Sequence, residues 1–157
     1  MGSRIEKYVV LVAIVAVAMV AGLARFVPSD SYELLAGAAA FAAMGLVAQI
    51  LTYSMATGSV GTIGFLPFLT CIVLYPAWPS VAMIGVAVLI SEMKEKKPNI
   101  KRLFNVSQYL VAYGAACLAY VILGGVSVQL NPSFQLIPLV GAVATFFLVN
   151  TWLVAIV

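Results

Sequence analysis

The sequence predicts an all-α integral membrane protein, a six-helix transmembrane bundle in which the third and fourth helices are short. Hydrophobic residues fill 64% of the 157 positions and charged residues only 8%, whereas roughly a quarter of the residues of soluble domains are charged. The apolar residues form six runs separated by short polar stretches. We therefore expect a single transmembrane domain over residues 1–157 whose main solvent is the lipid bilayer.

The first two runs are long enough to cross a bilayer, because a spanning helix needs about 20 apolar residues. We expect these spans at about residues 5–24 and 34–55. The first run follows Arg4 and Lys7, as a signal peptide would, but the rest of the chain is equally hydrophobic, which favours an uncleaved anchor. The second run is rich in Ala and Gly, which suits close contact between helices.

The third and fourth runs, at about residues 60–75 and 79–93, are shorter. Helices of about 15 residues would be about 22 Å long, less than the roughly 30 Å hydrocarbon core. Either they recruit flanking residues and span the membrane, or they form a re-entrant hairpin interrupted at Pro67. Pro76 and Pro79 flank Trp78 in the tight turn predicted between them.

The fifth and sixth spans are predicted at about residues 103–124 and 136–157. Residues 92–102 hold seven charges and Pro98, so we expect a solvated loop before the fifth span. The sequence stops within an apolar run without a polar tail. We therefore expect the chain to be truncated before a cytoplasmic output domain.

The basic residues predict the orientation. With a cytoplasmic N-terminus, six crossings leave only Arg25 outside. The basic residues inside are then Arg4, Lys7, Lys94, Lys96, Lys97, Lys101 and Arg102. Both termini are therefore expected in the cytoplasm, and a re-entrant third and fourth segment would preserve this assignment.

Composition disfavours several functions. The chain has no histidine and only two cysteines, so we expect no metal site and no cofactor. No Asp, Glu, Lys or Arg lies in the central part of a run, which disfavours proton-coupled transport. We expect no enzyme, since amides, phenols and hydroxyls lack an imidazole or carboxylate beside them. The net charge of +3 reflects topology, and no nucleic acid partner is expected.

Neutral polar side chains within the runs are the candidate ligand-binding residues. They are Gln49, Asn105, Gln108, Tyr109, Tyr113 and Asn150. Converging from separate helices, such groups could bind a small ligand, but interhelical hydrogen bonds alone are the favoured interpretation. In the fifth span Asn105, Tyr109, Tyr113 and Tyr120 recur at helical spacing along one face. That face could line an aromatic pocket or simply pack.

Three stretches carry a resemblance to a known family: residues 101–108 (KRLFNVSQ), residues 120–125 (YVILGG) and residues 147–151 (FLVNT). They resemble the N-terminal membrane-associated sensor (MASE-like) domains of bacterial HD-GYP and GGDEF proteins, which act on cyclic di-GMP. The resemblance implies the bacterial cytoplasmic (inner) membrane, a C-terminal cytoplasmic signalling domain as partner, and Asn105 and Asn150 as family positions. The output domains themselves are absent from this sequence.

The leading hypothesis is a sensory input domain that passes a ligand or membrane signal through its last helix to a cytoplasmic signalling domain, with a homodimer among the assemblies considered. The alternative is a small-molecule-binding membrane subunit of a transporter, similar to the substrate-binding subunits of energy-coupling factor transporters. A purely structural anchor is a third class. It predicts that Gln49, Gln108 and Asn150 tolerate apolar replacement.

Overall fold

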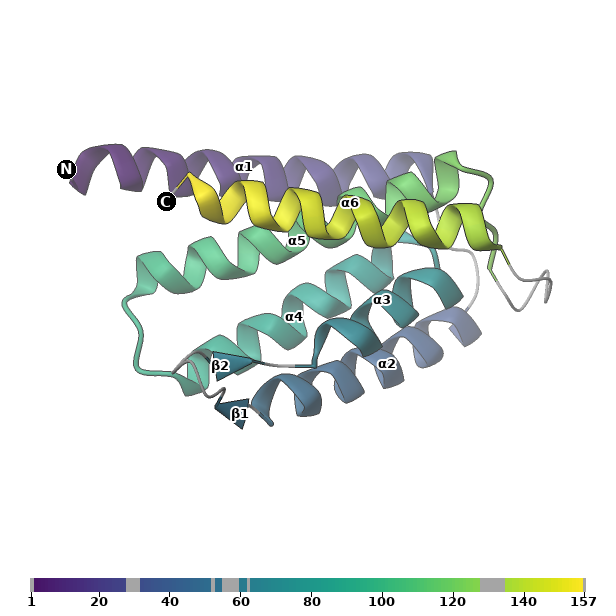
Figure 1. Ribbon diagram of the computed structural model, residues 1–157, viewed down its shortest axis with the longest axis horizontal. Helices are drawn as coiled ribbons and strands as arrows, with labels where there is room; N and C mark the ends of the chain where they lie inside the picture. The colour runs from purple at the N-terminus through teal and green to yellow at the C-terminus, as the bar shows by residue number, and fades with distance from the viewer. Residues whose placement is uncertain are drawn as a thin grey trace.

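The computed structural model describes residues 2–27, 32–51, 53–54, 60–61, 63–127 and 135–156. These residues form six α-helices and one short strand pair (Figure 1). The helices are α1 (Gly2–Phe26), α2 (Tyr32–Ile50), α3 (Phe65–Leu74), α4 (Trp78–Lys94), α5 (Asn99–Ile122) and α6 (Leu136–Ala155). Strands β1 (Tyr53–Ser54) and β2 (Val60–Gly61) pair in antiparallel register.

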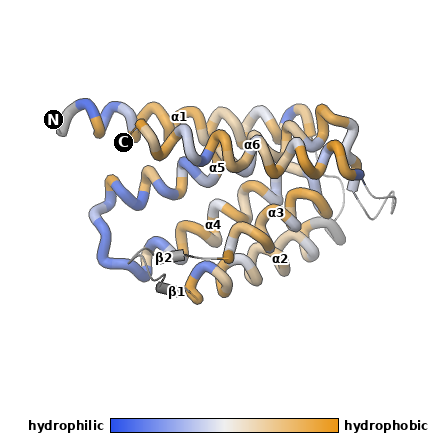
Figure 2. Tube along the Cα trace, in the orientation of Figure 1, coloured by the Kyte–Doolittle hydropathy of each residue, from blue (hydrophilic) through white to orange (hydrophobic). Residues whose placement is uncertain are grey.

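The six helices run in alternating directions, and α5 is the central one. It contacts α1, α3, α4 and α6, while α2 packs on α3 and α4. Figure 1 shows the N-terminus, the end of α6 and the α4–α5 loop at the same end of the bundle. Hydrophilic residues gather at the start of α1 and in this loop (Figure 2). We call this the basic end, because Arg4, Lys7 and residues 94–102 belong to these segments.

Three helices are long and apolar enough to cross a membrane: Arg4–Phe26, Asn99–Ile122 and Leu136–Ala155. Leu35–Ile50 and Phe65–Leu74 are shorter apolar helices. Large apolar side chains such as Val17 and Ile137 are about 70% exposed on the outside of the bundle, which is unfavourable in water and favourable in lipid. The chain is therefore all-α with candidate membrane spans.

The predicted boundary between the second and third spans is wrong. Helix α2 ends at Ile50, and α3 begins only at Phe65. Between them Tyr53 lies opposite Gly61, and Ser54 opposite Val60. Glycine lowers helix propensity by about 1 kcal/mol, and the glycine-rich stretch around this pair leaves the chain free to reverse direction. Met55 and Gly58 lie outside the described residues.

Pro67 does not interrupt α3. It is the third residue of that helix, where its missing N–H costs nothing because the first-turn donors have no partner within the helix. The ten residues of α3 give a length of about 15 Å, about half of the hydrocarbon thickness. The turn to α4 is closed by Ser80 Oγ, which donates to the Tyr75 carbonyl at 2.6 Å.

The charged segment before the fifth span is more ordered than predicted. Helix α4 continues through Glu92 to Lys94, and α5 starts at Asn99 rather than at residue 103. The Pro98 carbonyl accepts from the backbone N–H groups of Lys101 and Arg102 at 3.0 and 3.2 Å, so it begins the helix. The solvated loop is therefore short. Helix α6 matches its prediction closely, and Val157 lies outside the described residues.

Candidate functional site

A pocket of about 140 Å³ lies where α2, α3, α5 and α6 meet. Its lining residues are Gln49, Gly64, Phe65, Phe68, Tyr109, Phe146, Phe147 and Asn150. This volume is close to that of an apolar protein cavity that holds one benzene molecule. None of the lining side chains is charged. The pocket therefore suits a small neutral molecule, since an unpaired charge would be costly there.

Three of the six predicted ligand-binding residues line this pocket, each from a different helix. Gln49 comes from α2, Tyr109 from α5 and Asn150 from α6. Gln49 Oε1 is buried and has no hydrogen-bond donor among the described residues. A buried acceptor without a donor is unfavourable by about 1–3 kcal/mol. The pocket thus presents an acceptor that a ligand N–H or O–H would satisfy.

Gln108 lies behind Asn150 and fixes it. Gln108 Nε2 donates to Asn150 Oδ1 at 2.7 Å, and this bond joins α5 to α6. Gln108 is only 5% exposed. Because Asn150 also faces the pocket, its amide serves both the helix contact and the pocket wall.

Tyr113 packs behind the aromatic wall. Its ring stacks on Phe146 with centroids 4.6 Å apart and meets the edge of Phe68 at 5.6 Å. The Tyr109 ring lies 5.8 Å from that of Tyr113 and nearly parallel to it. Tyr113 is fully buried, and its hydroxyl has no partner among the described residues. This ring therefore links the pocket walls contributed by α3, α5 and α6.

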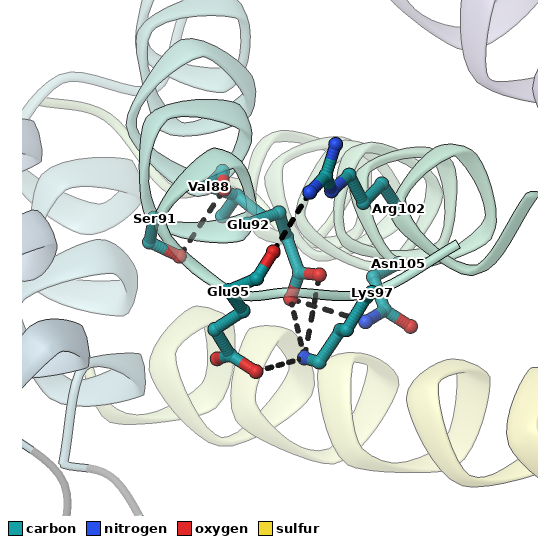
Figure 3. A network of polar contacts seen from close by, with 7 residues as sticks. All are labelled: Val88, Ser91, Glu92, Glu95, Lys97, Arg102 and Asn105. Atoms are coloured by element: carbon teal, nitrogen blue, oxygen red, sulfur yellow. Dashed lines mark hydrogen bonds and ion pairs between the residues drawn. The ribbon is translucent and has the colours of Figure 1, made fainter. Parts of the chain in front are cut away.

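Asn105 belongs to a second polar cluster at the basic end (Figure 3). Its Nδ2 donates to Glu92 Oε1 at 3.0 Å. Lys97 Nζ lies 3.3 Å from both Glu92 oxygens and 2.8 Å from Glu95 Oε2. Glu92 is 5% exposed, so its charge is compensated by Lys97 and the Asn105 amide. We call this group the Glu92 cluster.

The two acidic partners hold Lys97 in its charged form. Burial alone would lower the pKa of the Lys97 ammonium, but the hydrogen bond to Glu95 and the charge and hydrogen bonds of Glu92 together raise it above its usual value. Lys97 sits in the loop between α4 and α5, at the end of the bundle. It therefore remains a cation throughout the neutral pH range.

Sequence reasoning placed Glu92 in a solvated loop and missed its role. Its position after an apolar run looked like the start of the charged stretch, and only the contact with α5 reveals the burial. The aromatic wall was also missed. Phe146 and Phe147 precede Asn150 by four and three residues, a spacing that places them on its face of a helix. Among the described residues no group of acidic, cysteine or histidine side chains could hold a metal ion.

No family model matches this sequence, and neither a curated protein nor a solved structure matches it.

Proposed function

We propose that this chain is a membrane-embedded sensory input domain that binds a small neutral ligand between its helices and passes the signal through α6 to a cytoplasmic signalling domain. The observation that carries the proposal is a pocket lined both by Gln49 of α2, whose Oε1 has no donor among the described residues, and by Asn150 of α6. A ligand in this pocket contacts both α2 and α6. Its affinity therefore depends on the position of α6 relative to the other helices.

The ligand class follows from the pocket walls. Four phenylalanine rings and no charge favour a single flat ring, and the free acceptor favours a hydroxyl or amine donor on that ring. A phenol-like or similar neutral heterocyclic molecule combines these features. Its donor would satisfy Gln49 Oε1, and its ring would meet Phe147 and Phe146, whose centroids are 5.2 Å apart.

Signal transfer requires two arrangements of α6. In the arrangement described here α6 is held by the Gln108–Asn150 bond near the pocket and by the Tyr8 hydroxyl, which donates to the Leu153 carbonyl at 3.0 Å. A ligand that competes for the Asn150 amide weakens the first of these contacts. The last turn of α6, at the basic end, would then shift relative to α1 and α5.

The first test uses phenol as the probe. Phenol should raise the thermal midpoint of the detergent-purified chain, and Gln49→Leu should abolish most of that rise because the acceptor is lost. Thr70→Val is the matched control, since Thr70 is exposed and its hydroxyl bonds to the Leu66 carbonyl of its own helix. Equal phenol responses in Gln49→Leu, Thr70→Val and the parent chain would reject the pocket.

The second test concerns output. We would fuse a diguanylate cyclase domain after residue 157 and insert one to four alanines at the junction. A sensory input domain predicts activity that changes periodically with the inserted helix rotation and that responds to phenol. Activity indifferent to every insertion would contradict signal transfer through α6.

A transporter subunit is the second candidate, and the outer face of α1 favours it. Val10, Ala13, Ile14, Val17 and Ala18 line an open apolar cleft of about 510 Å³ together with Leu103. Small residues at such a face allow a partner helix to approach closely. Co-purification of the chain with an ATPase module, together with a vitamin retained on mass spectrometry, would favour this function over the sensory one.

A further inference from the structure

A second cleft, of about 540 Å³, opens at the basic end between α1, α5 and α6. It is lined by Ile5, Val9, Lys97, Ile100, Lys101, Phe104, Asn105 and Val154. Its floor is apolar, since Val9 and Phe104 are buried. Its only charged lining residues are the two lysines. The cleft is thus amphipathic, with cationic groups and an apolar wall in one space.

The two lysines of the cleft lie at the end of the bundle. On α5 the lining residues are Ile100 and Lys101 in the first turn, and Phe104 and Asn105 one turn inward. On α1 they are Ile5 and Val9, again one turn apart. Val9 and Phe104, the buried part of the apolar wall, therefore lie deeper along the helix axes than the lysines. This is the order of headgroup and acyl chain in a bilayer leaflet.

Of the two lysines of the cleft, Lys101 has no ion-pair partner among the described residues. Lys97 is paired with Glu92 and Glu95, but both described ion pairs involve Lys97 and neither involves Lys101. Lys101 is exposed. On the first turns of α1, Arg4 and Lys7 outnumber Glu6. The local field at the mouth of the cleft is therefore positive.

We propose that this cleft binds an anionic glycerophospholipid of the surrounding bilayer, with its phosphate at Lys101 and one acyl chain along Ile5, Val9, Phe104 and Val154. A zwitterionic lipid offers the same chain but no net negative charge. Free phosphate offers the charge but no chain. The site joins α1, α5 and the last turn of α6, so a bound lipid stabilises their contact. This inference does not depend on the ligand pocket.

The test measures which lipids the chain retains. The chain would be reconstituted into vesicles of equal parts phosphatidylglycerol and phosphatidylcholine, extracted gently, and analysed by native mass spectrometry. The parent chain should retain phosphatidylglycerol in preference to phosphatidylcholine. Lys101→Gln should reduce that preference about fivefold, the effect of one lysine near an anionic headgroup.

Lys96→Gln is the matched control, because it removes the same charge from an exposed position in the adjoining loop without touching the cleft. Equal losses in Lys96→Gln and Lys101→Gln would overturn the proposal in favour of general attraction to the basic end. Lys97→Gln is avoided, since it would also break the Glu92 cluster.

The apolar wall is tested without changing any charge. Val154→Trp and Ile5→Trp fill the cleft at positions that are half-exposed, so that the bundle can accommodate them. Each should lower phosphatidylglycerol retention while circular dichroism shows unchanged helix content. If both folded variants retained phosphatidylglycerol as well as the parent chain does, the proposed binding site for the acyl chain would be wrong. Displacement of the lipid by excess inorganic phosphate would also overturn it, because the acyl chain would then contribute nothing.

Discussion

The hydrogen bond between Gln108 and Asn150 gives the most direct measure of how α5 and α6 are held together. The donor and acceptor are 2.7 Å apart, and Gln108 is 5% exposed. Replacing Asn150 with leucine leaves the Gln108 amide buried without its acceptor, which should lower the free energy of unfolding by about 1–2 kcal/mol. Replacing Gln108 with methionine should have a similar effect. With both amides removed, no donor is stranded, and the loss should be no larger than that of either single variant.

The free energies of unfolding would be measured by titration with sodium dodecyl sulfate in mild detergent, followed by circular dichroism. The double-mutant cycle should return a coupling energy of about 1 kcal/mol between the two positions. Thr70→Val combined with Asn150→Leu is the control pair, because Thr70 bonds within α3 and should not couple. A Gln108–Asn150 coupling as small as that of the control pair would refute the assignment of this bond as an interhelical clamp.

In the same titration, Gly45→Ala should lower the free energy of unfolding by about 1–3 kcal/mol, because a Cβ there would overlap the buried ring of Phe68. The control is Gly22→Ala, which should be neutral or slightly stabilising because a Cβ at Gly22 meets open space. Glu92→Gln should cost about 1–2 kcal/mol, because the ion pair with Lys97 is lost while an acceptor oxygen is kept; a neutral result would contradict the Glu92 cluster. The pKa of Lys97 is raised above its ordinary value of 10.5, so its stabilising contribution should be complete below that pH and disappear as pH rises through the raised pKa. Lys97→Met should remove this alkaline loss of stability, and an unchanged pH profile would contradict it.

The helices that could be predicted from the sequence are those whose ends coincide with the boundary between an apolar run and polar residues. The fourth and sixth runs agree with α4 and α6 to within about two residues at each described end, since proline and polar residues mark them. The second and third spans were wrong where they meet, because α2 ends at Ile50 and Tyr53 pairs with Gly61 as a strand. A short apolar run does not by itself distinguish a helix from a strand.

The polar residues of the pocket could be predicted from the sequence, but their convergence and the aromatic wall could not. Gln49, Tyr109 and Asn150 stand out because amides and phenols are rare in apolar runs. Their convergence depends on how far each helix is rotated, and packing decides that. Gly45 lets the Phe68 ring approach α2 closely. Composition alone does not give that rotation.

The misplacement of Asn105 has a related cause. The helical spacing of Asn105 with Tyr109 and Tyr113 is real, and all three lie on α5. They nevertheless serve different neighbours, because Asn105 bonds to Glu92 of α4, whereas the Tyr113 ring packs on Phe68 of α3 and Phe146 of α6. A solvated loop over residues 92–102, as predicted, offers no buried partner for Asn105, whereas the structure buries Glu92 against it. An error in one helix boundary thus became an error in the site.

The same spacing has a mechanical consequence. Asn105, Gln108 and Tyr109 lie within about one turn of α5, and they reach the Glu92 cluster, Asn150 and the pocket respectively. A helix turns as a rigid unit over so short a distance. Any rotation of α5 that re-aims Tyr109 in the pocket must therefore also strain the bonds of Asn105 and Gln108. A change in the packing of the pocket therefore also changes the contact between α5 and α6 and the Glu92 cluster at the basic end.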